Sequence, residues 1–389
     1  MCSQMCSLLR PVRHMLALLF LSLITLAAQA SELNLGLSLS LSGKYAQPGV
    51  MNERAYRLWE QDVNRRGGLL GRSVRLSIVD DQSDPVRARQ IYEDFITKQK
   101  VDLLLAPYSS EITEVVANVA EQYRYPLLAS GASADTLWLQ GRKYLFGVYI
   151  TSSKYSIGML ELLVKSGLSK IAIVSADDNF SRGIEGGARE WAKRFELNVV
   201  FGDTYRKGTE EIEKSIRAAQ ASGAEVLLVA GHFDDSVAAR KVLKKIGWTP
   251  KAFYATVGPA IQKYADILKA DADHAFSSSQ WEPGLPFPGT REFAKAFTAA
   301  YQIEPSYHAA SAYAGGQILE AAIRKTQSLD REKLRDTLSS LDTMTVMGRY
   351  GVDRDGRQVR HFAVTVQWQK GKKEIVAPPE LATAKPLWR

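Results

Sequence analysis

The sequence predicts an α/β fold of two lobes, each a doubly wound parallel sheet with helices on both faces. Apolar segments typical of strands alternate with amphipathic helical segments from Leu33 onward. The alternation divides into two series, about residues 31–150 and 151–276, each with the size of an ordinary domain. Loops rich in small hydroxyl residues follow two of the strands, at the edge where open parallel sheets bind ligands.

The strand predictions depend on short apolar runs bounded by polar or turn-forming residues. The last of them follows a helical region and is able to complete either lobe. The predicted strands are Leu33–Leu41, Val74–Val79, Val101–Ala106, Pro126–Ala129, Ile171–Ser175, Val199–Phe201, Val226–Ala230, Ala252–Ala255 and Phe362–Trp368.

The helix predictions depend on an apolar period near 3.6 residues. In the first helix, Leu58, Trp59 and Val63 recur on one face, and Gly67 follows as a stop signal. The predicted helices are Met51–Asn64, Val86–Gln99, Ile112–Tyr123, Ile157–Ser166, Gly183–Phe195, Glu210–Ser222, Asp235–Ile246, Thr290–Tyr301, Tyr307–Lys325 and Asp330–Leu341.

The first thirty residues are typical of a secretory signal peptide. Arg10 and Arg13 precede the apolar run Met15–Ala27, and the small-residue sequence Ala28-Gln29-Ala30 follows. We therefore expect residues 1–30 to be removed and the remainder to be periplasmic. The alternative is a buried N-terminal helix.

Composition and motifs exclude several functional classes. Both cysteines lie within the leader, so its removal leaves no disulfide, thiol nucleophile or thiolate metal site. The formal net charge is +8, but basic residues are scattered among acids, which disfavours nucleic-acid binding and suits a small anionic ligand. No phosphate-binding loop and no His spacing typical of a metal site occurs, so we expect no cofactor and no metal.

Two Ser-rich loops are candidates for an anion site. Ser109 and Ser110 begin a helix, where hydroxyls lie beside free N–H groups, although an ordinary helix cap uses the same residues. Gly131 and Ser133 follow the next strand, and Gly131 permits either close approach of a ligand or a tight turn. Loops at neighbouring strand ends can converge on one carboxylate.

Aromatic side chains follow several other strands. They are able to enclose an apolar or aromatic ligand body, although each is also common in a protein core. These candidates are Tyr45, Phe180, His232, Phe233 and Trp281.

Five segments, taken in chain order, resemble the type I periplasmic solute-binding proteins of branched-chain amino acid and amide importers. The likeness extends over essentially the whole chain after the leader. The segments are Asn64–Gly71, Asp80–Pro85, Pro107–Ser110, Ala129–Ser133 and Ile171–Phe180.

The resemblance implies two Rossmann-like lobes joined by three crossovers, with the ligand held in the cleft as the lobes close. Lobe 1 would comprise residues 31–151 and 280–347, and lobe 2 residues 152–279 and 348–389. The protein would be a monomer that delivers its ligand to the membrane permease subunits of an ABC importer. One alternative is a ligand sensor for a membrane kinase, and another is a secreted serine hydrolase that uses Ser110 or Ser133 with a histidine.

The resemblance also implies roles for single residues. Ser110 matches the position that holds the ligand carboxylate. Ser133 matches a Thr that contacts both the carboxylate and the ammonium. Gly131 matches a position whose backbone carbonyl accepts a hydrogen bond from the ammonium. Phe180 matches a Tyr, and His232 with Phe233 an aromatic pair.

One departure from the family pattern concerns ligand specificity. Val257 stands where the amino acid binders place the acid that pairs with the ammonium. Because an unpaired ammonium in a closed cleft is costly, we expect a carboxylate with an apolar or aromatic body. Asp234 or Asp235 could instead replace the missing acid, so a free amino acid remains the alternative.

Overall fold

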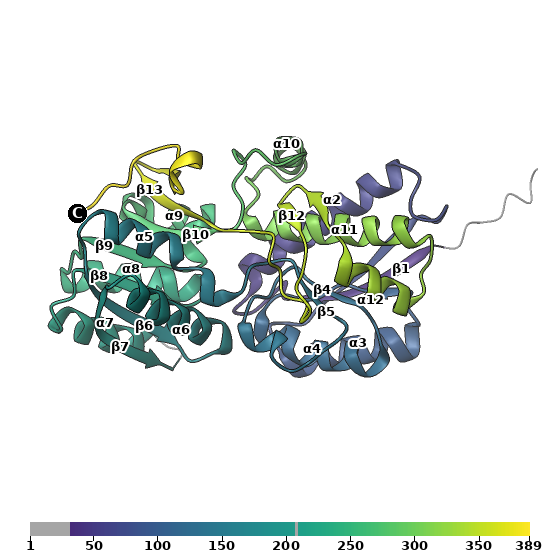
Figure 1. The fold of residues 1–389 in the computed structure, drawn as a ribbon, viewed down its shortest axis with the longest axis horizontal. Helices are drawn as coiled ribbons and strands as arrows, with labels where there is room; N and C mark the ends of the chain where they lie inside the picture. The colour runs from purple at the N-terminus through teal and green to yellow at the C-terminus, as the bar shows by residue number, and fades with distance from the viewer. Residues whose placement is uncertain (1–31, 207–208) are drawn as a thin grey trace, which may run out of the picture.

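A computed structural model describes residues 32–206 and 209–389 and shows two α/β lobes side by side (Figure 1). The expected signal peptide falls within residues 1–31, outside the described residues. Across the described ranges, no helix combines the length and the apolar character that a membrane crossing needs.

The sheet of the first lobe is parallel, with the order β2-β1-β3, and the pair β4-β5 continues it. The Ala106 N–H group donates to the Leu128 carbonyl at 3.4 Å, which joins β3 to β4. Every residue of β1 except Asn34 is buried, as expected for a strand covered on both faces. The strands are β1 (Leu33–Leu39), β2 (Val74–Asp80), β3 (Leu103–Leu104), β4 (Leu127–Ala129) and β5 (Leu145–Gly147).

Helices from both ends of the chain cover this sheet. Trp59 of the first helix packs against the last long helix at Gly316, where an added Cβ would lie 2.3 Å from the indole ring. The elements are α2 (Ala46–Arg65), α3 (Pro85–Asp94), α4 (Ser110–Tyr123), α10 (Thr290–Tyr301), α11 (Tyr307–Thr326), α12 (Arg331–Ser340) and the hairpin strands β11 (Thr343–Thr345) and β12 (Gly348–Tyr350).

The second lobe contains a seven-stranded sheet with the order β14-β13-β10-β9-β8-β6-β7. Strands β6 to β10 pair in parallel, whereas β13 and β14 add an antiparallel edge. The strand expected at Phe362–Trp368 therefore belongs to this lobe. The strands are β6 (Lys170–Ala176), β7 (Asn198–Tyr205), β8 (Val226–Ala230), β9 (Ala252–Ala255), β10 (Ala275–Ser279), β13 (Val364–Gln369) and β14 (Lys372–Ala377).

In chain order, α5 precedes the first parallel strand of the second lobe, and the other helices connect the parallel strands that follow. The C-cap of α8, Gly247, has a φ of 66°, which a glycine adopts without steric cost. The helices are α5 (Ile157–Lys165), α6 (Asn179–Arg194), α7 (Thr209–Ala221), α8 (Phe233–Ile246) and α9 (Gln262–Leu268).

The third crossover lies further along the chain than the expected position near Gly348. Strand β12 pairs with β11, and Tyr350 is buried in the first lobe, where its hydroxyl donates to the Leu338 carbonyl at 3.0 Å. The Gly147 N–H group donates to Gly356 O at 2.8 Å. These contacts keep the chain with the first lobe until after Gln358, because its buried anchors are there.

Gln280, in the second crossover, forms hydrogen bonds with residues of the other two crossovers. The side-chain carbonyl of Gln280 accepts from the Ile150 N–H at 2.9 Å, and its amide donates to the Tyr155 hydroxyl at 2.6 Å. The Gln280 backbone carbonyl accepts from His361 Nε2 at 2.8 Å. Burial of His361 lowers its pKa to about 4, so the ring is neutral at the junction.

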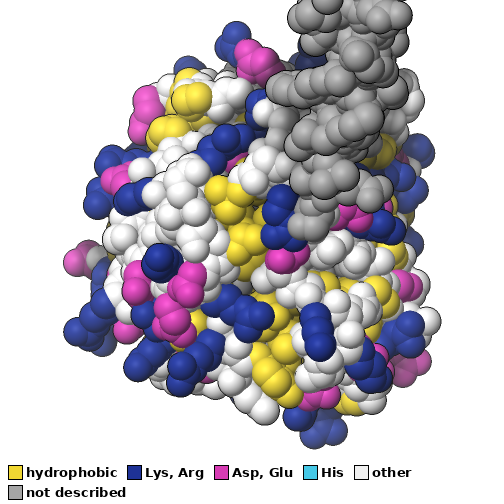
Figure 2. All heavy atoms as spheres, turned by 90° about the vertical axis from the view of Figure 1, so that its right-hand side faces the viewer, with side chains coloured by type: hydrophobic (Ala, Val, Ile, Leu, Met, Phe, Trp, Pro, Cys, Tyr) yellow, Lys and Arg dark blue, Asp and Glu magenta, His cyan; other side chains and the backbone are white. Residues whose placement is uncertain are grey.

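Charges of both signs are interspersed on the end face of the first lobe (Figure 2). Opposite charges also pair directly, as in Arg72 with Asp102 at 3.0 Å and Arg75 with Glu32 at 2.9 Å. The part of this face that Figure 2 leaves uncovered therefore carries no broad field of one sign, in agreement with the scattered charges of the sequence.

Candidate ligand-binding site

A small pocket lies between the lobes, where loops at the carboxyl ends of the parallel strands meet. First-lobe loops and the start of α11 form one wall, and loops after β6, β8 and β9 form the other. None of the lining side chains is Asp, Glu, Lys or Arg. The lining residues are Tyr108, Ser109, Ser110, Gly131, Ser133, Tyr149, Tyr155, Phe180, His232, Val257, Tyr307 and His308.

Ser110 begins α4 and presents its hydroxyl as a donor. The Ser110 Oγ accepts hydrogen bonds from the backbone N–H groups of Ser133 and Ala134, both at 3.0 Å. A hydroxyl has two acceptor positions and one proton. Because the two amides occupy the acceptor positions, the proton of Ser110 is directed to another acceptor, and it lies at the positive end of a helix.

Two residues of the crossovers, Gln280 and Tyr155, orient the Ser133 hydroxyl as a donor as well. The Tyr155 hydroxyl receives a hydrogen bond from Gln280 and donates its own proton to Ser133 Oγ at 3.1 Å. The Ser133 hydroxyl is then left to donate. Both serine hydroxyls thus act as donors on one wall, which is the arrangement that an anionic acceptor requires.

A chain of aromatic and imidazole rings surrounds the pocket. Neighbouring rings are 3.9–6.5 Å apart between centroids, and all of these pairs meet edge-on or tilted. Such contacts suit the flat faces and edges of a further aromatic ring. The order along the chain of rings is Tyr307 and Tyr149, His308, Tyr108, Tyr45, His232, Phe180 and Tyr155.

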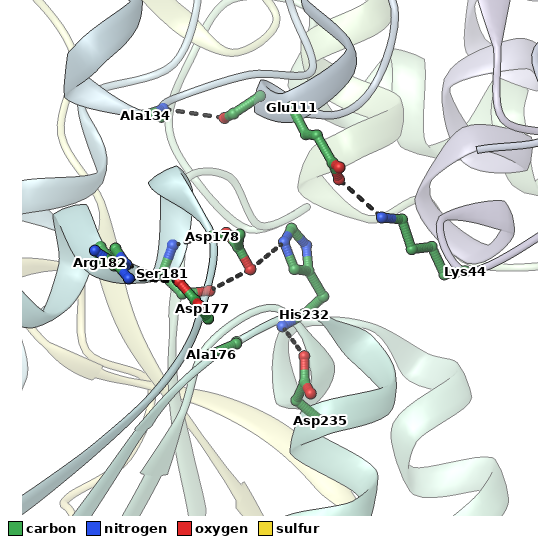
Figure 3. Close-up of polar contacts among 12 residues, drawn as sticks. Lys44, Glu111, Ala134, Ala176, Asp177, Asp178, Ser181, Arg182, His232 and Asp235 are labelled. Carbon is green, nitrogen blue, oxygen red and sulfur yellow. Dashed lines mark hydrogen bonds and ion pairs between the residues drawn. The ribbon is translucent and has the colours of Figure 1, made fainter. Parts of the chain in front are cut away.

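His232 joins the two walls. Its Nε2 lies 3.4 Å from Asp178 Oδ2, and its backbone N–H donates to Asp235 at 2.8 Å, as Figure 3 shows. Across the cleft, its ring contacts Tyr45 of the first lobe with centroids 4.9 Å apart. The Tyr45 hydroxyl donates to Glu111 at 2.7 Å, which fixes this ring against the imidazole.

Val257 occupies a γ-turn with positive φ. Its φ and ψ are 65° and −63°, and the Gly258 N–H donates to the Thr256 carbonyl at 2.7 Å. This conformation is strained for a β-branched residue. The turn places an apolar side chain in the pocket lining, at the position where the family resemblance led us to look for an acid.

Gly131 allows two loops to approach each other. An added Cβ would lie 2.9 Å from Pro107 O and 3.0 Å from Tyr108 Cα. The neighbouring loop thus requires Gly131 to lack a side chain, and a positive-φ turn is not the reason, because Gly131 is not among the glycines with positive φ. Gly131 also lines the pocket, so its approach to a ligand stays a prediction.

Three of the expected aromatic residues do not line the pocket. Tyr45 contacts the rings of His232 and Tyr108, which line the pocket, but Tyr45 is not itself part of the lining. Phe233 begins α8 and is buried in the core cluster that spans the lobes. Trp281 packs inside the first lobe against Phe293, because its indole N–H is satisfied there by the Val346 carbonyl at 3.0 Å.

The structure also places the acids that could have replaced the missing one. Asp235 accepts the His232 N–H at the start of α8, and Asp234 is exposed. Neither residue lines the pocket. The acid nearest to His232 Nε2, Asp178, caps α6 by accepting from the Ser181 N–H at 3.0 Å. Asp235 and Asp178 are therefore engaged by groups of the protein, and Asp234 lies outside the pocket lining.

No hydrogen bond joins either Ser110 or Ser133 to an imidazole in the described part of the chain. Ser110 bonds backbone amides and Ser133 bonds Tyr155. A serine nucleophile needs an adjacent base, so this arrangement does not support hydrolysis.

Several pocket residues were missed by the sequence analysis. Tyr108 belongs to a loop that was examined for its serines, and Tyr155 follows the first crossover. Tyr307 and His308 begin a helix whose start was predicted, but no strand leads into it. A search of strand ends alone could not find these two residues. Tyr149 also lines the pocket and was not among the candidates.

Comparisons with known proteins identify similar sequences and folds. The sequence model of the family described as "Periplasmic binding protein" matches residues 32–373. The Leu/Ile/Val-binding protein homolog 7 of Brucella suis biovar 1 (strain 1330) is 26% identical over 394 residues, which cover 95% of this chain and 98% of the relative.

Two solved structures show the same fold. A branched-chain amino acid transporter substrate-binding protein of Streptococcus pneumoniae, solved with isoleucine, has a TM-score of 0.81 and 21% identity and covers 90% of this chain and 100% of its own. An ABC transporter solute-binding protein of R. palustris, solved with benzoate, has a TM-score of 0.78 and 18% identity. The match covers 89% of this chain and 96% of that protein. At these identities the likeness concerns the fold alone.

Proposed function

We propose that this chain, which belongs to the periplasmic binding protein family, is the solute-binding component of an ABC importer and captures a small carboxylate with an aromatic or apolar body. The leader directs export to the periplasm. The closed lobes then present the ligand to the permease subunits, and the protein acts as a monomer without catalysing a reaction.

The observation that carries the proposal is the pair of hydroxyl donors on one wall. Ser110 Oγ accepts two hydrogen bonds from the protein and Ser133 Oγ accepts one, and each hydroxyl keeps its own proton available. The lining has no Lys or Arg, so these hydroxyls and the helix start supply the stabilisation of the anion.

The remainder of the lining supports an uncharged ligand body. It consists of aromatic and imidazole rings with Val257, Ser109 and Gly131, and it contains no acid to pair with an ammonium. Enclosing an unpaired ammonium among these groups would cost more than enclosing an apolar group. The different ligands in the two solved structures, isoleucine and benzoate, are both carboxylates, which agrees with a shared anion end and a variable body.

Calorimetric titration with benzoate, L-leucine and L-phenylalanine tests this function. We expect benzoate to bind and the two amino acids to bind weakly or not at all. Ser110→Ala and Ser133→Ala should each weaken benzoate binding by about 1–3 kcal/mol, the cost of a lost charged hydrogen bond.

Ser339→Ala is a matched control, because this exposed serine on α12 bonds only a carbonyl of its own helix. It should leave binding unchanged. Micromolar binding of L-leucine without binding of benzoate would refute the specificity, and unchanged affinity in both pocket variants would refute the anion site.

A further inference from the structure

His308 is a buried polar side chain that the proposed anion site does not use. It is the second residue of α11, it is 1% exposed, and it lines the pocket. Its Nδ1 lies 3.4 Å from the Ser306 hydroxyl, whereas its Nε2 has no hydrogen-bond partner in residues 32–206 and 209–389. A buried polar atom of this kind is costly unless a further group satisfies it.

The surroundings of His308 keep its ring neutral. Burial lowers its pKa to about 3, and its neighbours are the rings of Tyr108, Tyr149 and Tyr307. A neutral imidazole has one donor and one acceptor nitrogen. It therefore supplies one directional hydrogen bond and no charge, and its Nε2 is a donor or an acceptor according to the tautomer.

A hydroxyl group is the ligand chemistry that fits this nitrogen in either tautomer. If Ser306 donates to Nδ1, then Nε2 carries the proton and a ligand oxygen accepts it. If Nδ1 donates to Ser306, then Nε2 accepts a proton from the ligand. A hydroxyl is both donor and acceptor and meets both cases.

We propose that His308 Nε2 binds a hydroxyl group on the ring of the ligand, and that the ligand is accordingly a hydroxylated single-ring aromatic carboxylate. This inference deepens the proposed function and rests on it. The serines hold the carboxylate, the surrounding rings contact the aromatic body, and His308 distinguishes a hydroxylated ring from a bare one.

A purely structural histidine is the alternative. The ring of His308 lies 3.9 Å from that of Tyr307 and 5.5 Å from that of Tyr108, so it also packs. Phenylalanine would preserve this packing and remove both nitrogens. Substitution by phenylalanine therefore separates the two roles.

The test is calorimetric titration of the full exported chain with benzoate and with 2-, 3- and 4-hydroxybenzoate. We expect at least one hydroxybenzoate to bind tenfold or more tightly than benzoate. His308→Phe should weaken binding of that hydroxybenzoate by about 10- to 100-fold and leave benzoate affinity within about threefold of wild type. His308→Gln, which keeps a polar side chain, should recover part of the preference.

His274→Asn is the matched control, since His274 lies away from the pocket and has a φ of 67° that Asn tolerates. It should leave both affinities unchanged. Retained benzoate binding and a cooperative thermal transition show that each variant is folded.

Each failure has a distinct signature. If wild type binds benzoate and all three hydroxybenzoates equally, or if the preference survives in His308→Phe, the assignment of His308 is overturned and the proposed function stands. If no aromatic carboxylate binds the wild type, the aromatic part of the proposed function fails and this inference fails with it.

Discussion

Val257 shows how one residue can store strain at the pocket. Its positive φ costs about 1–3 kcal/mol for a β-branched side chain, and glycine adopts the same conformation without this cost. Val257→Gly should therefore lose less stability than Val229→Gly, a substitution in strand β8 where no strain is relieved.

Urea denaturation of the two variants measures this difference. Both valines are almost fully buried, at 2% and 0% exposure, so the loss of apolar contacts is similar. We expect the two losses in unfolding free energy to differ by at least about 1 kcal/mol. Equal losses would show that the γ-turn stores no strain.

The buried histidines predict a dependence of stability on pH. Burial lowers the pKa of His308 to about 3 and that of His361 to about 4, whereas an unfolded histidine titrates near pH 6.5. Below about pH 6.5 the unfolded chain binds protons that the folded chain does not, so the free energy of unfolding falls as the pH falls. This loss continues until the pH approaches the folded pKa values.

Comparison of wild type with His308→Phe isolates one of these contributions. Between pH 7 and pH 5, the unfolding free energy of wild type should fall by about 2 kcal/mol more than that of the variant. Between pH 7.5 and pH 8.5, where unfolded histidine is neutral, the two should change in parallel. Identical profiles between pH 7 and 5 would mean that the pKa of His308 is the same in the folded and the unfolded protein.

At the scale of elements, the packing of α2 on α11 depends on a helical glycine. A Cβ at Gly316 would lie 2.3 Å from the Trp59 ring, a distance that real contacts do not show. Gly316→Ala should force the two helices apart and destabilise the first lobe by about 1–3 kcal/mol.

Gly186→Ala is the matched control, because this helical glycine of α6 has no heavy atom within 4 Å of an added Cβ. Alanine is the better helix former, so this variant should gain about 0.5–1 kcal/mol. Thermal unfolding of both variants checks the opposite signs. A stabilising Gly316→Ala would contradict the close packing.

At the scale of the whole molecule, the contacts across the cleft predict closure on ligand binding. Tyr45 of the first lobe contacts His232 of the second, and the pocket is lined from both sides. A ligand that touches both walls stabilises the closed arrangement over an open one, and only such differential contacts shift that equilibrium.

Small-angle scattering measures this shift directly. The radius of gyration should fall when a saturating aromatic carboxylate is added, and Tyr45→Ala should require a higher ligand concentration for the same change. An unchanged radius of gyration at saturation would indicate that the lobes do not move relative to each other.

Sequence reasoning predicted the elements whose signal is local. Strand β1 and helix α4 were predicted from apolar runs and helical periodicity, and the helix start at Tyr307 was predicted from the same periodicity. Strand β10 was missed because it ends in three serines. Their hydroxyls are satisfied in the buried sheet, as Ser278 is by the Tyr155 carbonyl, and this makes a polar sequence compatible with a buried strand.

The sequence by itself determined the fold class, the family resemblance and the serine loops, because apolar periodicity and loop chemistry are encoded in neighbouring residues. Only the tertiary structure decided which aromatic residues face the pocket. It buried Trp281 where its N–H finds the Val346 carbonyl, and it brought His308 beside Tyr108 from 200 positions away in the chain. Contacts between residues so distant depend on how helices and sheets pack, and no local pattern of residues records that packing.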